Sequence, residues 1–192
     1  MKHPITLLFL TLFLTSCISV KFKSLKSLEK GRLIAFPKSY RGYYVSKDND
    51  TLIINESTLN MGYDSLEGKY LIDTLKRGSY EIAKFNKYLI ICKKDDKYWD
   101  FIPVVKKGNE IKVYYLDPEE FSDKKFPMVQ DSDKKNELFF NELNKITKTE
   151  KIFKERENLD FYLIDPSESE LEILLSNGFF SPLDTLRRIE SP

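Results

Sequence analysis

Short apolar runs alternate with polar turns from Arg32 to Leu116. The runs are rich in tyrosine, isoleucine, valine and leucine, and several alternate apolar and polar positions as a half-buried strand does. Turn-forming tetrapeptides separate them, such as Lys47-Asp48-Asn49-Asp50, Lys94-Asp95-Asp96-Lys97 and Lys107-Gly108-Asn109-Glu110. The predicted strands are Arg32–Phe36, Arg41–Ser46, Thr51–Asn55, Thr58–Met61, Lys69–Leu75, Tyr80–Phe85, Lys87–Lys93, Tyr98–Val105 and Ile111–Leu116.

The connections between these runs are too short for the crossover helices of a parallel sheet, so the strands form an antiparallel meander. Ile111, Val113 and Tyr115 share one face of the last strand. Pro103 lacks an amide donor and predicts an edge or a bulge. Eight or nine such strands close into a barrel or split into two packed sheets.

A helix–strand–helix pattern follows the meander. Residues 134–146 predict a helix with Asp133 as its N-cap, and Leu159–Ile164 predicts a strand. Asp165-Pro166-Ser167-Glu168 predicts a second helix start, with Asp165 as the cap. In the tail from Phe179 to Pro192, four apolar residues are candidates for packing: Phe179, Phe180, Leu183 and Leu186. The fold class is therefore mainly β with C-terminal α (α+β).

The N-terminus has the layout of a secretory signal. Lys2 and His3 give a basic start, Ile5 to Leu14 is apolar apart from two threonines, and small residues precede Cys17. The apolar stretch is about half the ~20 residues of a membrane-spanning helix. Leu14-Thr15-Ser16-Cys17 resembles the lipobox of bacterial lipoproteins. The resemblance implies removal of residues 1–16 as a signal peptide, diacylation of the Cys17 thiol and, usually, acylation (for example palmitate) of its new amino group.

This resemblance sets the expected domain organisation and location. Residues 17–30 are predicted to be a lipidated tether, and 31–192 a single β-rich domain with a meander over 31–118 and an α-containing part over 119–192. The tether's lysines (Lys21, Lys23, Lys26 and Lys30) either lie on anionic headgroups or belong to a soluble spacer. Ile18 stands where enterobacterial lipoproteins retained on the inner membrane have Asp, and no acidic run follows Cys17. The resemblance therefore implies a membrane-anchored protein of the bacterial cell envelope, facing the periplasm and on the outer membrane if the host has two.

Charge and cysteine content narrow the possibilities. Loss of residues 1–16 takes one lysine and no acid from 31 basic and 30 acidic residues, so the remaining 176 residues carry no net charge. A neutral balance argues against a nucleic-acid partner. If Cys17 carries lipid, Cys92 has no partner within the chain, and its place after Tyr88-Leu89-Ile90-Ile91 predicts a buried, inert thiol.

The chemistry available to the mature chain is limited. The one histidine, His3, leaves with the signal peptide, which removes Ser-His-Asp and Cys-His catalysis and His-ligated metal sites. Gly-rich phosphate loops are absent from the sequence. Asp48-Asn49-Asp50 and Asp131-Ser132-Asp133 fit turn and cap chemistry better than calcium loops. We therefore expect no enzyme, no cofactor and no metal, with a carboxylate-based hydrolase as the less favoured exception.

Gly42-Tyr43-Tyr44 opens an early strand and is similar to the Gly-x-Trp motif of lipocalins, eight-stranded ligand-binding barrels; Tyr44 stands where that motif has Trp. The candidate binding residues are Tyr43, Tyr44, Tyr98 and Trp99, because aromatic side chains give large contact areas with polar tips. Two functions remain open for a non-catalytic lipoprotein. One is binding of a small apolar ligand or glycan in an aromatic-lined cavity, and the other is a structural or assembly role in contact with other envelope proteins.

Overall fold

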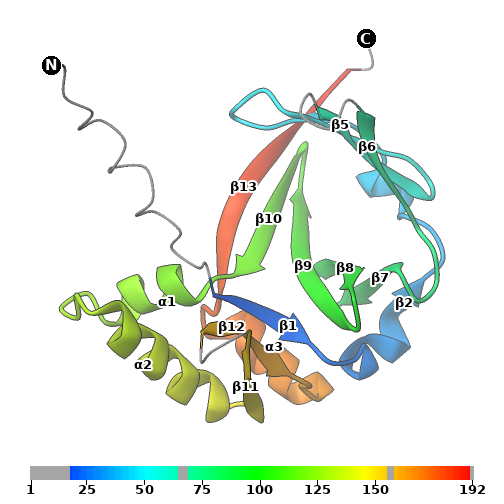
Figure 1. Cartoon of the computed structure of the whole chain (residues 1–192). Coiled ribbons are helices and arrows are strands. Elements are labelled where there is room, and N and C mark those ends of the chain that lie inside the picture. Colours follow the sequence, from blue (N-terminus) through cyan, green and yellow to red (C-terminus); the bar gives the residue numbers. More distant parts are fainter. Residues whose placement is uncertain (1–17, 65–68, 155–157, 191–192) are drawn as a thin grey trace, which may run out of the picture.

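The computed structural model describes residues 18–64, 69–154 and 158–190, and its strands join in one curled sheet (Figure 1). The strands are β1 (Ser19–Phe22), β2 (Arg32–Leu33), β3 (Gly42–Val45), β4 (Thr51–Ile54), β5 (Thr58–Asp64), β6 (Lys69–Thr74), β7 (Tyr80–Phe85), β8 (Tyr88–Asp95), β9 (Tyr98–Lys107), β10 (Glu110–Leu116), β11 (Thr149–Phe153), β12 (Leu159–Ile164) and β13 (Phe180–Ile189). The helices are α1 (Pro118–Lys125), α2 (Ser132–Asn144) and α3 (Glu168–Ser176), with short 3₁₀ turns η1 (Lys26–Gly31) and η2 (Lys38–Tyr40). The α+β prediction is confirmed. Within the described ranges, no helix has the length and apolar content needed to span a membrane.

Tight turns fix the register of the central hairpins. Asn86, Asp96 and Gly108 adopt the left-handed conformation in the connections β7–β8, β8–β9 and β9–β10. Asparagine, aspartate and glycine tolerate a positive φ, and such turns match the right-handed twist of paired strands. The meander predicted for this region is confirmed, and its strand bounds differ from the predicted ones by a few residues at most.

The sheet forks at β9. One side of β9 pairs with β8 from Tyr98 to Val104, while the other side pairs with β10 only as far as the Val104–Val113 pair and with β1 at Trp99. Pro103 lies beside this fork, where β10 departs and its register with β13 shifts after Val113. β9 is thus not an edge strand. The missing amide of Pro103 instead coincides with the point where pairing with β10 ends.

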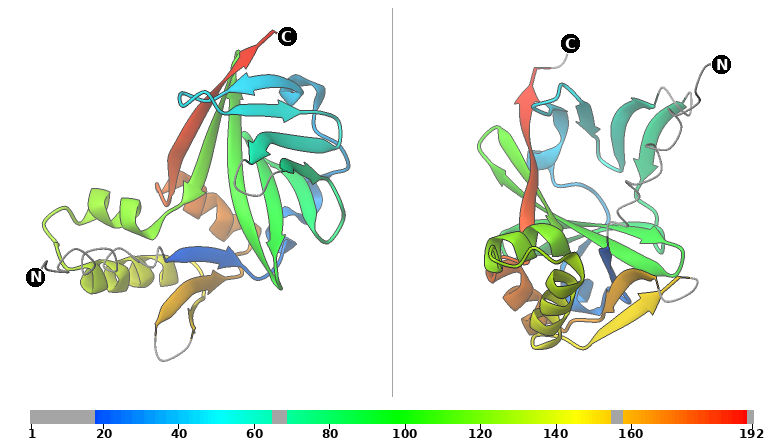
Figure 2. Two further views of the ribbon diagram at one scale, coloured as in Figure 1. Left: turned by 45° about the horizontal axis from the view of Figure 1, so that its top comes forward. Right: turned by 60° about the vertical axis from the view of Figure 1, so that its left-hand side comes forward.

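Two hydrophobic cores lie on opposite faces of β7–β9. Leu89 and Ile91 point into one core, and Ile90 and Cys92 point into the other, as strand alternation requires. The first, called here the barrel core, is enclosed as β10, β13 and β3–β6 curl into a half-barrel (Figure 2). The second, called here the helix core, is covered by η1, β1, β12 and the three α-helices. Cys92 is buried as predicted, and burial raises the pKa of its thiol, which keeps it uncharged.

The prediction of a tether over residues 17–30 is wrong for the described part of that range. Residues 19–31 include β1 and η1, and four apolar side chains of this range are buried in the helix core: Val20, Phe22, Leu25 and Leu28. Lys21 binds Asp95 and Asp100 at 2.9 and 2.6 Å instead of facing headgroups. Burial alone would lower the pKa of Lys21, but these two carboxylates outweigh it and raise the pKa. The segment is therefore an integral part of the domain.

The C-terminal part also contains elements that the pattern did not predict. α1 begins at Pro118 under the cap of Asp117, and β11 and β13 were not foreseen. β13 lies inside the sheet between β10 and β3, with Phe179, Phe180 and Leu186 buried and Leu183 exposed. Two predicted caps are wrong: Asp131 rather than Asp133 caps α2, and Ser167 rather than Asp165 caps α3, in a capping box with Glu170.

Candidate functional site

The four aromatic residues predicted to bind a ligand do not form one site. Tyr44 is fully buried in the barrel core, where its hydroxyl donates to the Tyr40 carbonyl oxygen at 2.8 Å. Trp99 is buried in the helix core, on the other side of the central strands. Tyr98 is half-buried and packs edge-on against Phe161, with ring centroids 5.2 Å apart. Tyr43, the neighbour of Tyr44 on β3, points to the outer face of the sheet.

Buried side chains of the barrel core lie inside the half-barrel. The segment after β2 crosses its open side and places Phe36 in the barrel core, while the Phe36 amide donates to the Glu56 carbonyl oxygen at 2.8 Å. Phe36 and Tyr44 are packed there with aliphatic side chains from β4, β5, β7–β10 and β13: Ile54, Leu59, Ile82, Leu89, Ile91, Val104, Ile111 and Leu186. Close packing of this kind is typical of a structural core rather than of a ligand cavity.

The outer face of β13 and β3–β6 carries a row of four apolar side chains, with Asn60 between the last two. Ile189 pairs with Tyr43, Tyr43 pairs with Ile53, and the row continues through Asn60 to Ile72. Directly opposed residues lie about 4.5–5.5 Å apart at Cβ and share one face, so the row is continuous across five strands. Ile189 and Ile72 at its two ends are 41% and 53% exposed, whereas Tyr43 and Ile53 between them are half-buried. Aliphatic side chains on the outside of a sheet make this outer row the main candidate for an interaction surface.

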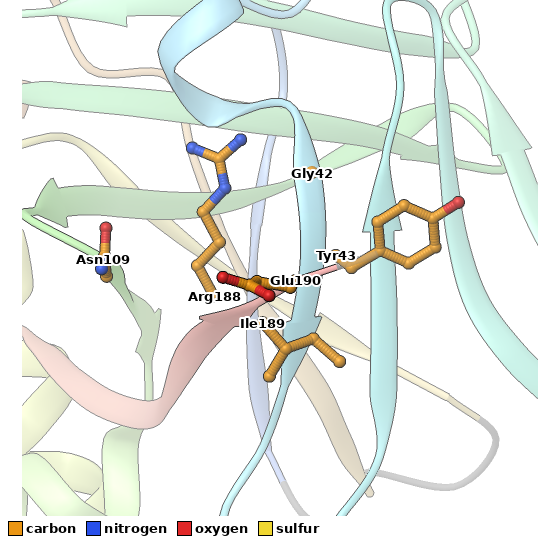
Figure 3. Close-up of a pocket in the computed structure, with 6 residues that line it drawn as sticks. All are labelled: Gly42, Tyr43, Asn109, Arg188, Ile189 and Glu190. Atoms are coloured by element: carbon orange, nitrogen blue, oxygen red, sulfur yellow. The ribbon is translucent and has the colours of Figure 1, made fainter. Parts of the chain in front are cut away.

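An open pocket of about 490 Å³ adjoins the end of the row. It is lined by Gly42, Tyr43, Asn109, Arg188, Ile189 and Glu190 (Figure 3). The Arg188 guanidinium lies against Gly42 and donates to the Arg41 carbonyl oxygen at 2.9 Å, which ties β13 to β3. A Cβ at Gly42 would stand 2.8 Å from Arg188 Nε, so the Arg188 side chain would have to shift, and the φ of 146° at Gly42 is a backbone conformation that favours glycine.

The pocket has a mixed lining, in which Asn109, Arg188 and Glu190 supply the polar side chains. The Tyr43 ring points away from Arg188, on the other side of the β3 ribbon (Figure 3). Lys106 lies near Arg188, and burial together with that second positive charge lowers the pKa of Lys106. Its ammonium donates to the Gly108 carbonyl oxygen at 2.7 Å. Arg188 thus joins strands at the end of the half-barrel, and the aromatic ring beside it belongs to the outer row.

Two carboxylates converge at the start of α1. The Tyr115 hydroxyl lies 2.6 Å from Asp117 Oδ2 and 3.3 Å from Glu120 Oε2, and these two acids raise the pKa of Tyr115. Asp117 also accepts the amides of Glu119 and Glu120 as the N-cap, and Lys124 pairs with Glu120 at 2.6 Å. Asp117 is thus engaged in capping the helix, and Glu120 in an ion pair. Over residues 18–64, 69–154 and 158–190, no group of three or more acidic, cysteine or histidine side chains is placed to hold a metal ion.

Comparison with known proteins gives no further assignment: the chain matches no protein-family model, no curated protein and no solved structure. Cys17, the predicted lipidation site, lies outside the described residues. The residues that the sequence analysis missed are Ile53, Ile72, Ile189 and Arg188. A signal for the first was present, because Leu52-Ile53-Ile54 is apolar at every position and so predicts apolar groups on both faces of the strand.

Proposed function

We propose that the chain is a lipid-anchored, non-catalytic lipoprotein of the bacterial cell envelope that contacts another envelope protein through the outer row. The observation that carries this proposal is the row Ile189, Tyr43, Ile53 and Ile72 on the outside of the sheet, in which Asn60 is the one polar member. Contiguous exposed apolar surface on a soluble domain is typical of protein–protein contacts. The clustering of buried side chains inside the half-barrel favours this assembly role over binding of a small apolar ligand there.

The lipid anchor rests on Leu14-Thr15-Ser16-Cys17 and is tested separately. Cys17→Ala should abolish incorporation of a labelled fatty acid and stop cleavage of the precursor, because the thiol is the acceptor for the lipid. Cys92→Ala is the matched control, since a buried cysteine cannot serve as that acceptor and this variant should label like the parent. Equal labelling of Cys17→Ala and the parent would show that the chain is not a lipoprotein.

The outer row is tested by photo-crosslinking in intact cells. A benzophenone amino acid placed at Ile72 or at Ile189 should give the same discrete adduct, because both side chains border one surface. Ile173 on α3 is the matched control: it is also isoleucine and is 41% exposed, as Ile189 is, but it lies outside the row. A probe at Ile173 should give no such adduct.

Two results would count against the assembly role. One is the absence of any adduct from Ile72 and Ile189 in cells where the protein is made and processed. The other is an identical adduct pattern from Ile173, which would reflect crowding rather than a specific contact. The substitution Ile53→Lys tests whether the contact depends on the apolar character of the row. A charge at the middle of the row should abolish the adducts, while the thermal unfolding midpoint stays close to that of the parent.

A further inference from the structure

The predicted lipidation site is directly adjacent to the folded domain. Ile18 already packs against the helix core, and β1 begins at Ser19. In the sequence, Cys17 directly precedes Ile18, so a lipid on its thiol would be attached one residue before the core. We propose that the domain rests directly on the bilayer, with the tip of the α1–α2 hairpin in contact with the lipid headgroups. The inference rests on the proposed lipid anchor and names the surface that the anchor presses against the membrane.

β1 cannot serve as a tether by leaving the domain. It pairs in parallel with β12 from the Ser19–Phe161 pair to the Phe22–Ile164 pair. Phe22 is buried, and its ring stacks on Phe101 with the centroids 3.7 Å apart. Lys21 adds ion pairs to both strands of the β8–β9 hairpin. Release of β1 would expose the helix core to solvent. We therefore expect β1 to stay in the folded domain when the chain is attached to the membrane.

The α1–α2 hairpin projects from the domain on the side where β1 begins (Figures 1 and 2). Tyr162, which pairs with Val20 in β1, donates its hydroxyl to the Asn136 carbonyl oxygen in the first half of α2 at 2.9 Å. The start of α2 is therefore close to the start of β1. The loop between α1 and α2 contains Met128, which is 91% exposed. An exposed methionine at the tip of a hairpin on the anchored side is suited to contact with headgroups and acyl chains.

Charge contributes little to this contact. Lysines flank the loop at the end of α1 and in the first turn of α2, but acidic side chains neutralise three of them: Lys124 pairs with Glu120, Lys125 with Glu142, and Lys135 with Asp123. The lipid anchor and the apolar tip therefore determine the orientation. We expect the contact to be similar on vesicles of neutral and of anionic phospholipids.

The experiment attaches the anchor chemically, so that it does not depend on processing in cells. In a chain starting at Cys17, a maleimide phospholipid reacts with that thiol, because Cys92 is buried and its raised pKa keeps it unreactive. Met128→Trp and, as the matched control, Ile72→Trp each add a tryptophan at an exposed apolar position, while buried Trp99 stays as the reference. Each conjugate is bound to phosphatidylcholine vesicles, or to vesicles that also contain phosphatidylglycerol, with brominated acyl chains in both.

The proposal predicts that bromine quenches the emission of the Met128→Trp conjugate, with a blue shift, and leaves the Ile72→Trp conjugate like the parent. Quenching at Ile72 without quenching at Met128 would place the opposite face on the membrane and overturn it. Vesicle-bound conjugates with no quenching at either position would also overturn it, because the domain would then stand away from the bilayer. Failure of fatty-acid labelling at Cys17 in cells would instead refute the proposed anchor and leave these quenching results unchanged.

Discussion

A chain that begins at Lys30 should fail to fold, whereas one that begins at Ile18 should unfold cooperatively on heating. The shorter chain lacks four side chains that are buried in the helix core: Val20, Phe22, Leu25 and Leu28. Full burial of one such side chain contributes about 1.5–3 kcal/mol, so the deletion removes about 6–12 kcal/mol, an upper estimate. The total stability of a domain is only about 5–15 kcal/mol. The deletion also leaves one edge of β12 unpaired.

Circular dichroism and thermal unfolding of the two purified chains test this expectation. The chain from Ile18 should show a single transition, and the chain from Lys30 should show either no transition or aggregation. A cooperative transition of the Lys30 chain within a few degrees of the longer chain would mean that residues 18–29 are dispensable. The conclusion that no tether separates residue 17 from the domain would then be wrong, and the proposed membrane contact depends on that conclusion.

Phe139→Ala should lower the free energy of unfolding by about 3–5 kcal/mol, the usual range for loss of a buried phenylalanine. Phe139 is fully buried, and its ring meets those of Phe121, Phe179 and Tyr162 at centroid distances of 5.4, 5.9 and 5.5 Å. It therefore joins α2 to α1, to β12 and to the residue that leads into β13. Truncation would leave a cavity where these elements meet, and edge-to-face ring contacts would be lost as well.

Phe153→Ala is the matched control for this substitution. Phe153 lies on β11 and is 53% exposed, so its removal should change the free energy of unfolding by no more than about 0.5 kcal/mol. Urea unfolding of the parent and both variants gives the comparison, provided that the slope of the transition stays the same. Equal shifts for the two variants would mean that the aromatic cluster does not hold the helices to the sheet.

Strands are predicted correctly from the sequence where turn-forming residues and the pattern of apolar positions agree. The strands β7 to β10 follow from short apolar runs, which in β8 are apolar at every position from Leu89 to Cys92, and from the turns that contain Asn86, Asp96 and Gly108. Sequence reasoning failed for β1 and η1, because lysines intervene among the buried residues and resemble the solvated spacer that a lipobox suggests. In β13, Pro182 and the register shift beside it interrupt the alternation that would otherwise indicate a strand.

The candidate surface was harder to predict than the fold. Aromatic residues were chosen for their contact area, but the same property favours burial, and Tyr44 and Trp99 are in the two cores. The outer row is formed by cross-strand pairing between β13, β3, β4, β5 and β6. Register between strands distant in sequence depends on the folded sheet, so Ile72 and Ile189 cannot be placed on one surface from local pattern alone.

The position of β13 between β10 and β3 affects the order in which the chain can fold. β3 acquires its second neighbour only when residues 180–189 are present, and β1 pairs with β12, some 140 residues further along. Pairing across such separations is slow, because the entropy cost of closing the loop arises before the stabilising contacts form. In a chain that crosses a membrane from its N-terminus, as proposed for this protein, neither core can be completed until the last strand has emerged. For a chain exported as proposed, this topology would delay formation of both cores until residues 180–189 have crossed the membrane.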